Sequence, residues 1–141
     1  MGSGDLRRVR EVFKKASLMG FFSATILGLL LMVGGRAIIR VFTEDPVVMQ
    51  YSIWYLFIVA GTYGCLAVGM IVANVFQSMG SSWPGFWLFF VKFFVISIPL
   101  SYLVTHVYHF PIWSVWGVIA ASNFLMAAFG YLWLEKRLGK V

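Results

Sequence analysis

Long apolar runs separated by short polar segments dominate the pattern of this sequence. The first run without a charged residue covers the 20 residues 16–35. A helix of that length, rising about 1.5 Å per residue, crosses the roughly 30 Å hydrocarbon core of a bilayer. A secretory signal peptide would have an apolar core of only about 7–15 residues. The pattern therefore predicts a transmembrane helix over 16–35.

A mixed-charge turn is expected next, between Arg36 and Asp45. Asp45 followed by Pro46 is typical of a helix start, because an aspartate caps the first free N–H groups and proline needs no hydrogen bond at the first helical position. We therefore expect the next helix to begin at Pro46.

The second apolar run, 46–91, contains no charged residue and has one polar break, at 78–84. A single helix over 46–77 would be about 48 Å long and would exceed the bilayer core. Either its first turns lie at the membrane interface and it bends near Gly61 or Gly64, or it crosses as one long tilted helix. The pattern leaves both arrangements open.

Two further spans are predicted in the last part of the chain. The third covers 83–105, with Ser82 as its cap and a kink near Pro99, because proline removes one backbone hydrogen bond. A polar and aromatic link at 106–111 leads to the fourth, over 113–134. The four spans predict an all-α, polytopic membrane protein.

The composition supports this class of protein. Hydrophobic residues make up 61% of the 141 residues and charged residues 11%, whereas soluble domains have about 45–50% and about 25%. Aromatic residues, at 18%, together with the long aliphatic runs exclude a disordered chain.

The net charge of +6 reflects the membrane topology rather than a nucleic-acid partner. Of the eleven basic residues, five lie in 1–15, three in 135–141, and two in the turn expected between Arg36 and Asp45. Basic residues that flank membrane spans stay on the cytoplasmic side. We expect 1–15 to be a basic cytoplasmic segment and 135–141 a cytoplasmic tail of a protein in the inner cell membrane.

The sequence offers little chemistry for an enzyme. His106 and His109 can share a helix face, but no carboxylate or thiol near them in sequence completes a metal site. Cys65 is the single cysteine. Glycine-rich phosphate loops and the Gly-x-Ser-x-Gly motif are absent. We expect no enzymatic activity, no catalytic residues, and no bound metal or cofactor.

All five acidic residues are predicted to lie outside the spans. Ion-coupled transport commonly uses a carboxylate inside the membrane, because burial makes its charge sensitive to proton or ion exchange. Their placement argues against an autonomous transporter of the four-helix small multidrug resistance type. The five are Asp5, Glu11, Glu44, Asp45 and Glu135.

Lys92 is the one charged residue inside a predicted span, about 12 Å along the third helix from Pro84. It either snorkels toward the cytoplasmic interface or faces a cavity, where it contacts substrate or a partner carboxylate. The candidate substrate or cavity residues are Lys92, Gln77 and Asn74. Hydrogen bonding between helices is the alternative role for the polar span residues, which are Asn74, Gln77, Ser97, Ser101, Ser122 and Asn123.

Several short segments resemble a known transporter family in their order and spacing. The segments are the basic start 4–10, Phe42-Thr43 with Asp45-Pro46, Tyr55-Leu56, the turn Phe76-Gln77-Ser78-Met79-Gly80, Ile98-Pro99-Leu100-Ser101-Tyr102-Leu103, and Val115-Trp116. Together they resemble the last four helices of a multidrug and toxic compound extrusion (MATE) transporter. Ser78 and Ser114 stand where that family usually has glycine.

A full MATE transporter has twelve helices in two six-helix lobes and exchanges cationic drugs or metabolites for protons or sodium. The resemblance implies that this chain is part of the C-terminal lobe and inactive alone. Its partners would be the bilayer, the missing helices and a cationic small molecule. Three alternatives stay open: copies of the chain that assemble into a pathway, a membrane scaffold or accessory subunit, and part of a related flippase of lipid-linked sugars.

Overall fold

Every regular element of the structure is helical. The structure is a computed structural model that describes residues 6–138, with side chains from Arg8 onward. Predictions for 1–5, including Asp5, and for 139–141 lie outside the described residues. The η elements are π-helices, whose turns are wider than those of an α-helix. The elements are α1 (Leu6–Phe42), α2 (Pro46–Tyr55), η1 (Leu56–Ala60), α3 (Tyr63–Ser78), α4 (Trp83–Phe90), η2 (Val91–Ser97), α5 (Ile98–Tyr102), η3 (Leu103–Val107) and α6 (Trp113–Leu138).

Three continuous helices in the described range are long and apolar enough to cross a membrane: α1, the run from Trp83 to Val107, and α6. The pair formed by α2–η1 and α3 passes the same test together and is bent by 52°. The predicted all-α, polytopic membrane fold is confirmed, with its second span divided in two.

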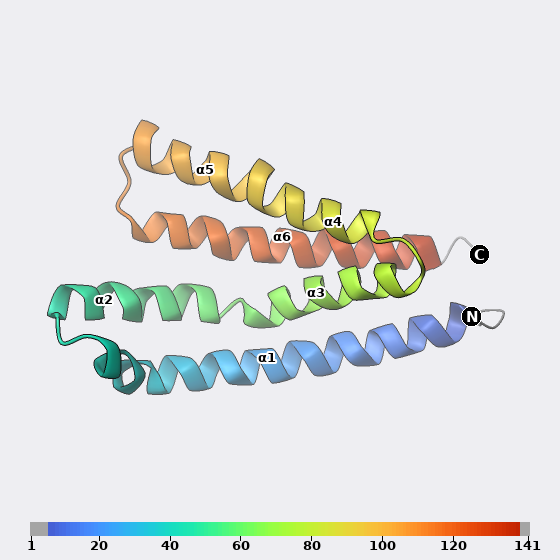
Figure 1. The fold of residues 1–141 in the computed structure, drawn as a ribbon, viewed down its shortest axis with the longest axis horizontal. Coiled ribbons are helices and arrows are strands. Elements are labelled where there is room, and N and C mark those ends of the chain that lie inside the picture. The colour runs from blue at the N-terminus through green and yellow to red at the C-terminus, as the bar shows by residue number, and fades with distance from the viewer. Residues whose placement is uncertain (1–5, 139–141) are drawn as a thin grey trace.

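Figure 1 shows the helices stacked as antiparallel rods, with the described start and end of the chain on the same side. α3 packs against α1, α4 and α6. We call the side with the chain ends the terminal end; it holds the start of α1, the end of α3, the start of α4 and the end of α6. The opposite side, with the end of α1, α2, α5, η3 and the start of α6, is the distal end.

α1 is longer than predicted. It continues through Arg36 to Phe42, so the turn expected over 36–45 is reduced to the residues 43–45. The prediction was wrong because charges end an apolar stretch without breaking a helix. Arg36 and Arg40 are both exposed and lie one turn apart on the same helix.

The start of α2 matches its prediction. The Asp45 carboxylate accepts hydrogen bonds from the backbone N–H groups of Val47 (2.8 Å) and Val48 (3.4 Å), and Pro46 occupies the first turn. Two of the free donors at the helix start are thereby satisfied.

The predicted bend lies at Gly61 and Thr62, between η1 and α3. α1 approaches this break closely, because a Cβ on Gly28 would overlap the carbonyl oxygen of Ala60, and one on Gly64 would overlap a side chain of α1. The break favours a divided second span over one long tilted helix. That its first half lies at the membrane interface stays a prediction.

Ser82 precedes α4 but its side chain does not cap the helix, contrary to the prediction. Its backbone is already helical (φ −75°, ψ −16°), and Pro84 lacks the N–H that a cap would bind at the second helical position. Further along, Pro99 follows the π-helix η2, where the N–H of Ile98 donates to the carbonyl of Phe93, five residues back. The turns just before Pro99 are therefore wider than those of an α-helix, and the helix continues past the proline into η3.

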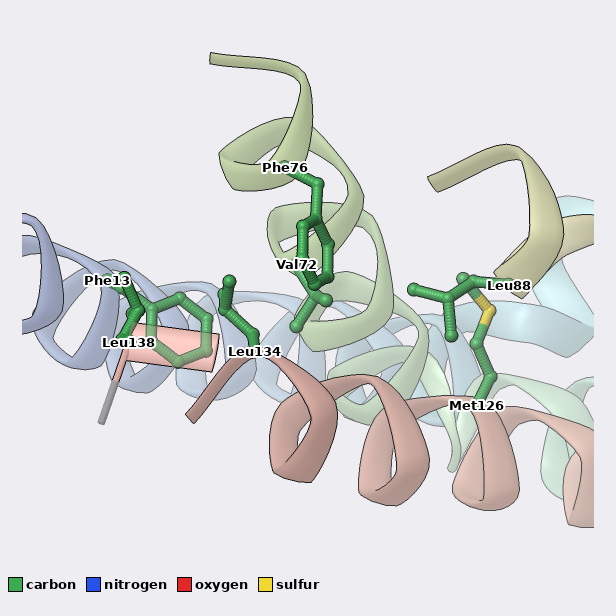
Figure 2. Close-up of a cluster of buried hydrophobic side chains, with 7 residues drawn as sticks. All are labelled: Phe13, Val72, Phe76, Leu88, Met126, Leu134 and Leu138. Atoms are coloured by element: carbon green, nitrogen blue, oxygen red, sulfur yellow. The ribbon is translucent and has the colours of Figure 1, made fainter. Parts of the chain in front are cut away.

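The tightest packing lies at the terminal end, where side chains from α1, α3, α4 and α6 meet (Figure 2). A glycine lets the helices approach: a Cβ on Gly130 would lie 3.3 Å from side-chain carbons of Val72 and Leu88. Inside a bilayer, such close contact rather than exclusion of water holds helices together. The buried cluster consists of Phe13, Val72, Phe76, Leu88, Met126, Leu134 and Leu138.

Charged side chains join α1 to α6 at the same end. The Arg10 guanidinium donates to one oxygen of the Glu135 carboxylate through Nε (2.9 Å) and Nη2. The Nζ of Lys14 lies 3.6 Å from the other oxygen. We call this group of three residues the terminal clasp.

The distal end is packed more loosely. No residue of α2, α5 or η3 is buried. Trp116 of α6 meets the rings of Tyr51 and Tyr55 edge-on, with centroids 6.2 and 6.0 Å apart. Aromatic edges, rather than interlocked aliphatic side chains, connect α2 to α6 there.

Candidate functional site

A row of buried polar side chains, Thr62, Asn123, Ser122 and Ser97, crosses the middle of the bundle. The side-chain amide of Asn123 on α6 donates to the hydroxyl of Thr62 at the break before α3 (2.7 Å). That hydroxyl donates in turn to the carbonyl of Val59 in η1 (2.8 Å). The break in the second span is therefore hydrogen-bonded to the fourth. We call these four residues the polar row.

The polar row continues from α6 to the third span. The Ser97 hydroxyl in η2 donates to the Ser122 hydroxyl (3.1 Å), which donates to the carbonyl of Ile119 (2.7 Å). Asn123, the residue after Ser122, lies about 15 Å along α6 from Trp113, near the middle of the span. The bonds show that Ser97, Ser122 and Asn123 join helices at mid-depth.

One atom of the polar row has no partner. The oxygen Oδ1 of Asn123, a residue only 2% exposed, accepts no hydrogen bond from any described residue. An unpaired buried acceptor costs on the order of 1–3 kcal/mol. Such an oxygen can accept a hydrogen bond from water or from a bound molecule, or it can coordinate a cation.

Lys92 lies in η2, five residues before Ser97, and is 4% exposed. Its Nζ lies 4.8 Å from the centre of the Phe93 ring, a cation–π contact. Within residues 8–138 it forms no ion pair. Lys92 lines an apolar groove of about 470 Å³ between the third span and α6. Its side chain therefore lies against protein and not on the outer face of the bundle.

Asn74 and Gln77 lie elsewhere, exposed in the last turns of α3. Both line a groove of about 420 Å³ whose other wall is aromatic, with the stacked rings of Phe86 and Phe90 5.7 Å apart. Lys92 does not line this groove. The structure thus divides the three candidate residues between two grooves.

Thr62 was missed by reasoning from the sequence. It bonds to Asn123 at the break, and the residue is 4% exposed. The available signal was a hydroxyl directly after Gly61 in an uncharged run too long for one span. A polar residue at a helix break inside a membrane needs a partner from another helix.

The histidines do not take part in these sites. His106 packs against the ring of Tyr102 (4.7 Å between centroids), and His109 lies in the link with φ 51°. In the part of the chain that the structure describes, no three His, Cys, Asp or Glu side chains gather to hold a metal ion. The site chemistry is hydrogen bonding and one buried ammonium group.

Comparison with known proteins places this arrangement in a family. The MatE family model matches residues 1–103, nearly three quarters of the chain. The match includes the broken second span with Thr62, and the third span with Lys92 and Ser97. No curated protein sequence matches the chain closely enough to count as a relative. With this family match on a polytopic helical fold, the chain belongs to the MatE family of membrane transporters.

Proposed function

We propose that this chain works as part of a secondary transporter that exports cationic organic compounds in exchange for protons or sodium ions. The observation that carries the proposal is the polar row at mid-depth in a MatE-family fold. Secondary transporters bind substrates and coupling ions near the bilayer midplane, at broken helices. Here the break at Gly61 and Thr62 is joined to the row through Thr62, and Asn123 Oδ1 is a buried acceptor that receives no hydrogen bond from any described residue.

Further helices complete the pathway in this proposal, and the chain alone is inactive. The described acidic residues, Glu11, Glu44, Asp45 and Glu135, lie outside the predicted apolar stretches. A carboxylate that exchanges protons or sodium then comes from the helices of another lobe. The exposed amides of Asn74 and Gln77 support this, because lipid offers them no hydrogen bonds.

Both chain ends face the cytoplasm of a cell with this transporter in its inner membrane. The described ends of the chain share one side of the bundle (Figure 1). Exposed basic residues support the orientation, because such residues are retained in the cytoplasm. Those at the terminal end are Arg8, Arg10, Lys14, Lys15, Lys136 and Arg137, against Arg36 and Arg40 near the distal end.

Orientation is tested by labelling single cysteines in a Cys65→Ser background. A membrane-impermeant maleimide applied outside the cell is expected to label Glu44→Cys and to leave Lys136→Cys unlabelled until the membrane is opened. The reverse labelling pattern contradicts the orientation.

Function is tested with a chimera in which this chain replaces the last four helices of a working twelve-helix MATE transporter. We expect proteoliposomes with the chimera to export a cationic dye along a proton or sodium gradient, and those with the chain alone to export none. Asn123→Leu should abolish export by the chimera. Ser101→Ala, a serine outside the polar row, is the matched control and should retain it.

Each other outcome has a definite meaning. Gradient-driven export by the chain alone contradicts the need for further helices. A folded chimera that exports no dye, or whose export survives Asn123→Leu, overturns the role of the polar row. Movement of a lipid-linked sugar in place of the dye assigns the chain to the flippases.

A further inference from the structure

A second site lies next to the polar row, in the groove between the third span and α6. We call it the Lys92 groove. Its volume is about 470 Å³, and its walls are apolar and aromatic, with two polar residues among them. The residues that matter here are Trp87, Lys92 and Ile96 on one wall and Ser122, Phe129 and Trp133 on the other.

We propose that the Lys92 groove binds a hydrophobic organic acid such as a long-chain fatty acid. Its carboxylate pairs with the Lys92 ammonium group, and its apolar body lies along the groove walls. This site would take an anion, so it goes beyond the proposed export of cations, and it stands whether or not the chain transports anything.

The charge of Lys92 is the first support. The residue is 4% exposed, and within residues 8–138 it has neither a hydrogen bond nor an ion pair. Its ammonium group contacts the face of the Phe93 ring. The nearby Ser122 hydroxyl already donates to Ile119 and accepts from Ser97. A buried ammonium group is costly without an anion, and a carboxylate supplies charge-assisted hydrogen bonds.

The shape of the groove is the second support. Its lining on the third span runs from Trp87 to Ile96, about 14 Å along the helix. Over that length the walls are apolar except for Lys92 and Ser122. An elongated apolar groove with one ammonium group suits the hydrocarbon chain and the carboxylate of a fatty acid.

The described acids of this chain do not supply the carboxylate themselves. Lys92 lies about 14 Å along its helix from Trp83. The described acids, Glu11, Glu44, Asp45 and Glu135, lie near the ends of the spans, so a second copy of the chain does not bring one of them to the depth of Lys92. A free acid that partitions into the bilayer reaches that depth.

The test measures tryptophan quenching in the full chain, placed in nanodiscs of phosphatidylcholine, with Trp87 and Trp133 as the retained tryptophans. Brominated palmitic acid is compared with the brominated alcohol of the same chain length, which partitions similarly but carries no charge. We expect half-maximal quenching by the acid at a concentration about tenfold lower than by the alcohol. Lys92→Met should remove this difference, and Lys92→Arg should preserve most of it.

Lys136→Met is the matched control, because it removes a basic residue that is exposed outside the groove. It should leave the preference for the acid unchanged, and circular dichroism of every variant checks the fold. Equal quenching by acid and alcohol, or a preference that survives Lys92→Met, overturns the proposal. So does an equal loss in Lys136→Met, which would indicate general attraction to the surface.

Two further arms separate other sources of an anion. Nanodiscs with phosphatidylglycerol that abolish the acid preference in the wild type show that a lipid phosphate fills the groove. A dimer that dissociates on Lys92→Met shows that a second copy does. Either result overturns the assignment to a free carboxylic acid, and neither bears on export of cations.

Discussion

The terminal and distal ends of this bundle are held together in different ways. At the terminal end, side chains from four helices form one buried cluster, and the Arg10–Glu135 pair joins α1 to α6. At the distal end, no residue of α2, α5 or η3 is buried, and α2 meets α6 through the ring of Trp116. The break at Gly61 lies between the two halves of the second span.

The packing within the chain therefore fixes the geometry of only one half of the bundle. The distal half presents apolar and aromatic faces that lipid or further helices can cover. Alternating access requires elements that rock about a central binding site. The polar row lies at mid-depth, at the break in the second span, which suits the role proposed for it.

The largest effect is expected from emptying the core of the terminal end. Phe76 is 0% exposed and packs in the buried cluster. Phe76→Ala should lower the free energy of unfolding by about 3–5 kcal/mol. Phe57 of η1 is 53% exposed, and Phe57→Ala should change it by about 0.5 kcal/mol or less.

Both variants are measured by reversible unfolding in mixed micelles, followed by circular dichroism. Similar losses in the two variants would contradict the contrast between the tightly and the loosely packed helices.

A smaller effect is expected without any mutation. Amide hydrogen exchange in nanodiscs should be faster in α2 (Pro46–Tyr55) than in the second half of α3 by about tenfold or more, or about 1.4 kcal/mol of opening free energy. The reason is that α2 has no buried residue, whereas Val72 and Phe76 of α3 are fully buried. Equal protection of both segments would show that lipid alone stabilises the distal end.

The spans and several of their ends could be predicted from the sequence. Uncharged runs of sufficient length define a membrane helix whatever it packs against. Asp45 and Pro46 act locally, so their helix start was predictable too. The cap predicted at Ser82 was wrong, because a cap also needs suitable backbone angles and a free N–H group, and Pro84 has no N–H. The predicted end of α1 is too early, because Arg36 ends the apolar run without ending the helix.

Less of the candidate site than of the fold could be predicted from the sequence. Polar residues in the spans were identified, but which of them meet depends on how each helix is rotated, and hydropathy does not distinguish a lipid face from a protein face. Asn123 and Thr62 are 61 residues apart and come together only by folding. Asn74 and Gln77 were grouped with Lys92 by residue type, and the fold places them in another groove.

The bond between Thr62 and Asn123 should contribute less than the core does. A double-mutant cycle of Thr62→Val and Asn123→Ala should give a coupling energy of about 0.6 kcal/mol, and at most about 1.7 kcal/mol, as for hydrogen bonds between membrane helices. The same cycle with Ser97→Ala in place of Thr62→Val should give less, because Ser97 bonds to Ser122 and not to Asn123. A larger coupling with Ser97 would show that the row responds as one unit.

The terminal clasp should contribute least, because its basic members are largely exposed: the side chains of Arg10 and Lys14 are 45% and 53% exposed. Glu135→Gln keeps the size of the side chain and removes its charge. Its loss of stability should be smaller than the Thr62–Asn123 coupling and should vanish at high salt, because exposed charges are screened. Glu44→Gln makes the same change in net charge at the distal end, so an equal, salt-sensitive loss there would show that total charge, and not the clasp, is what the measurement reports.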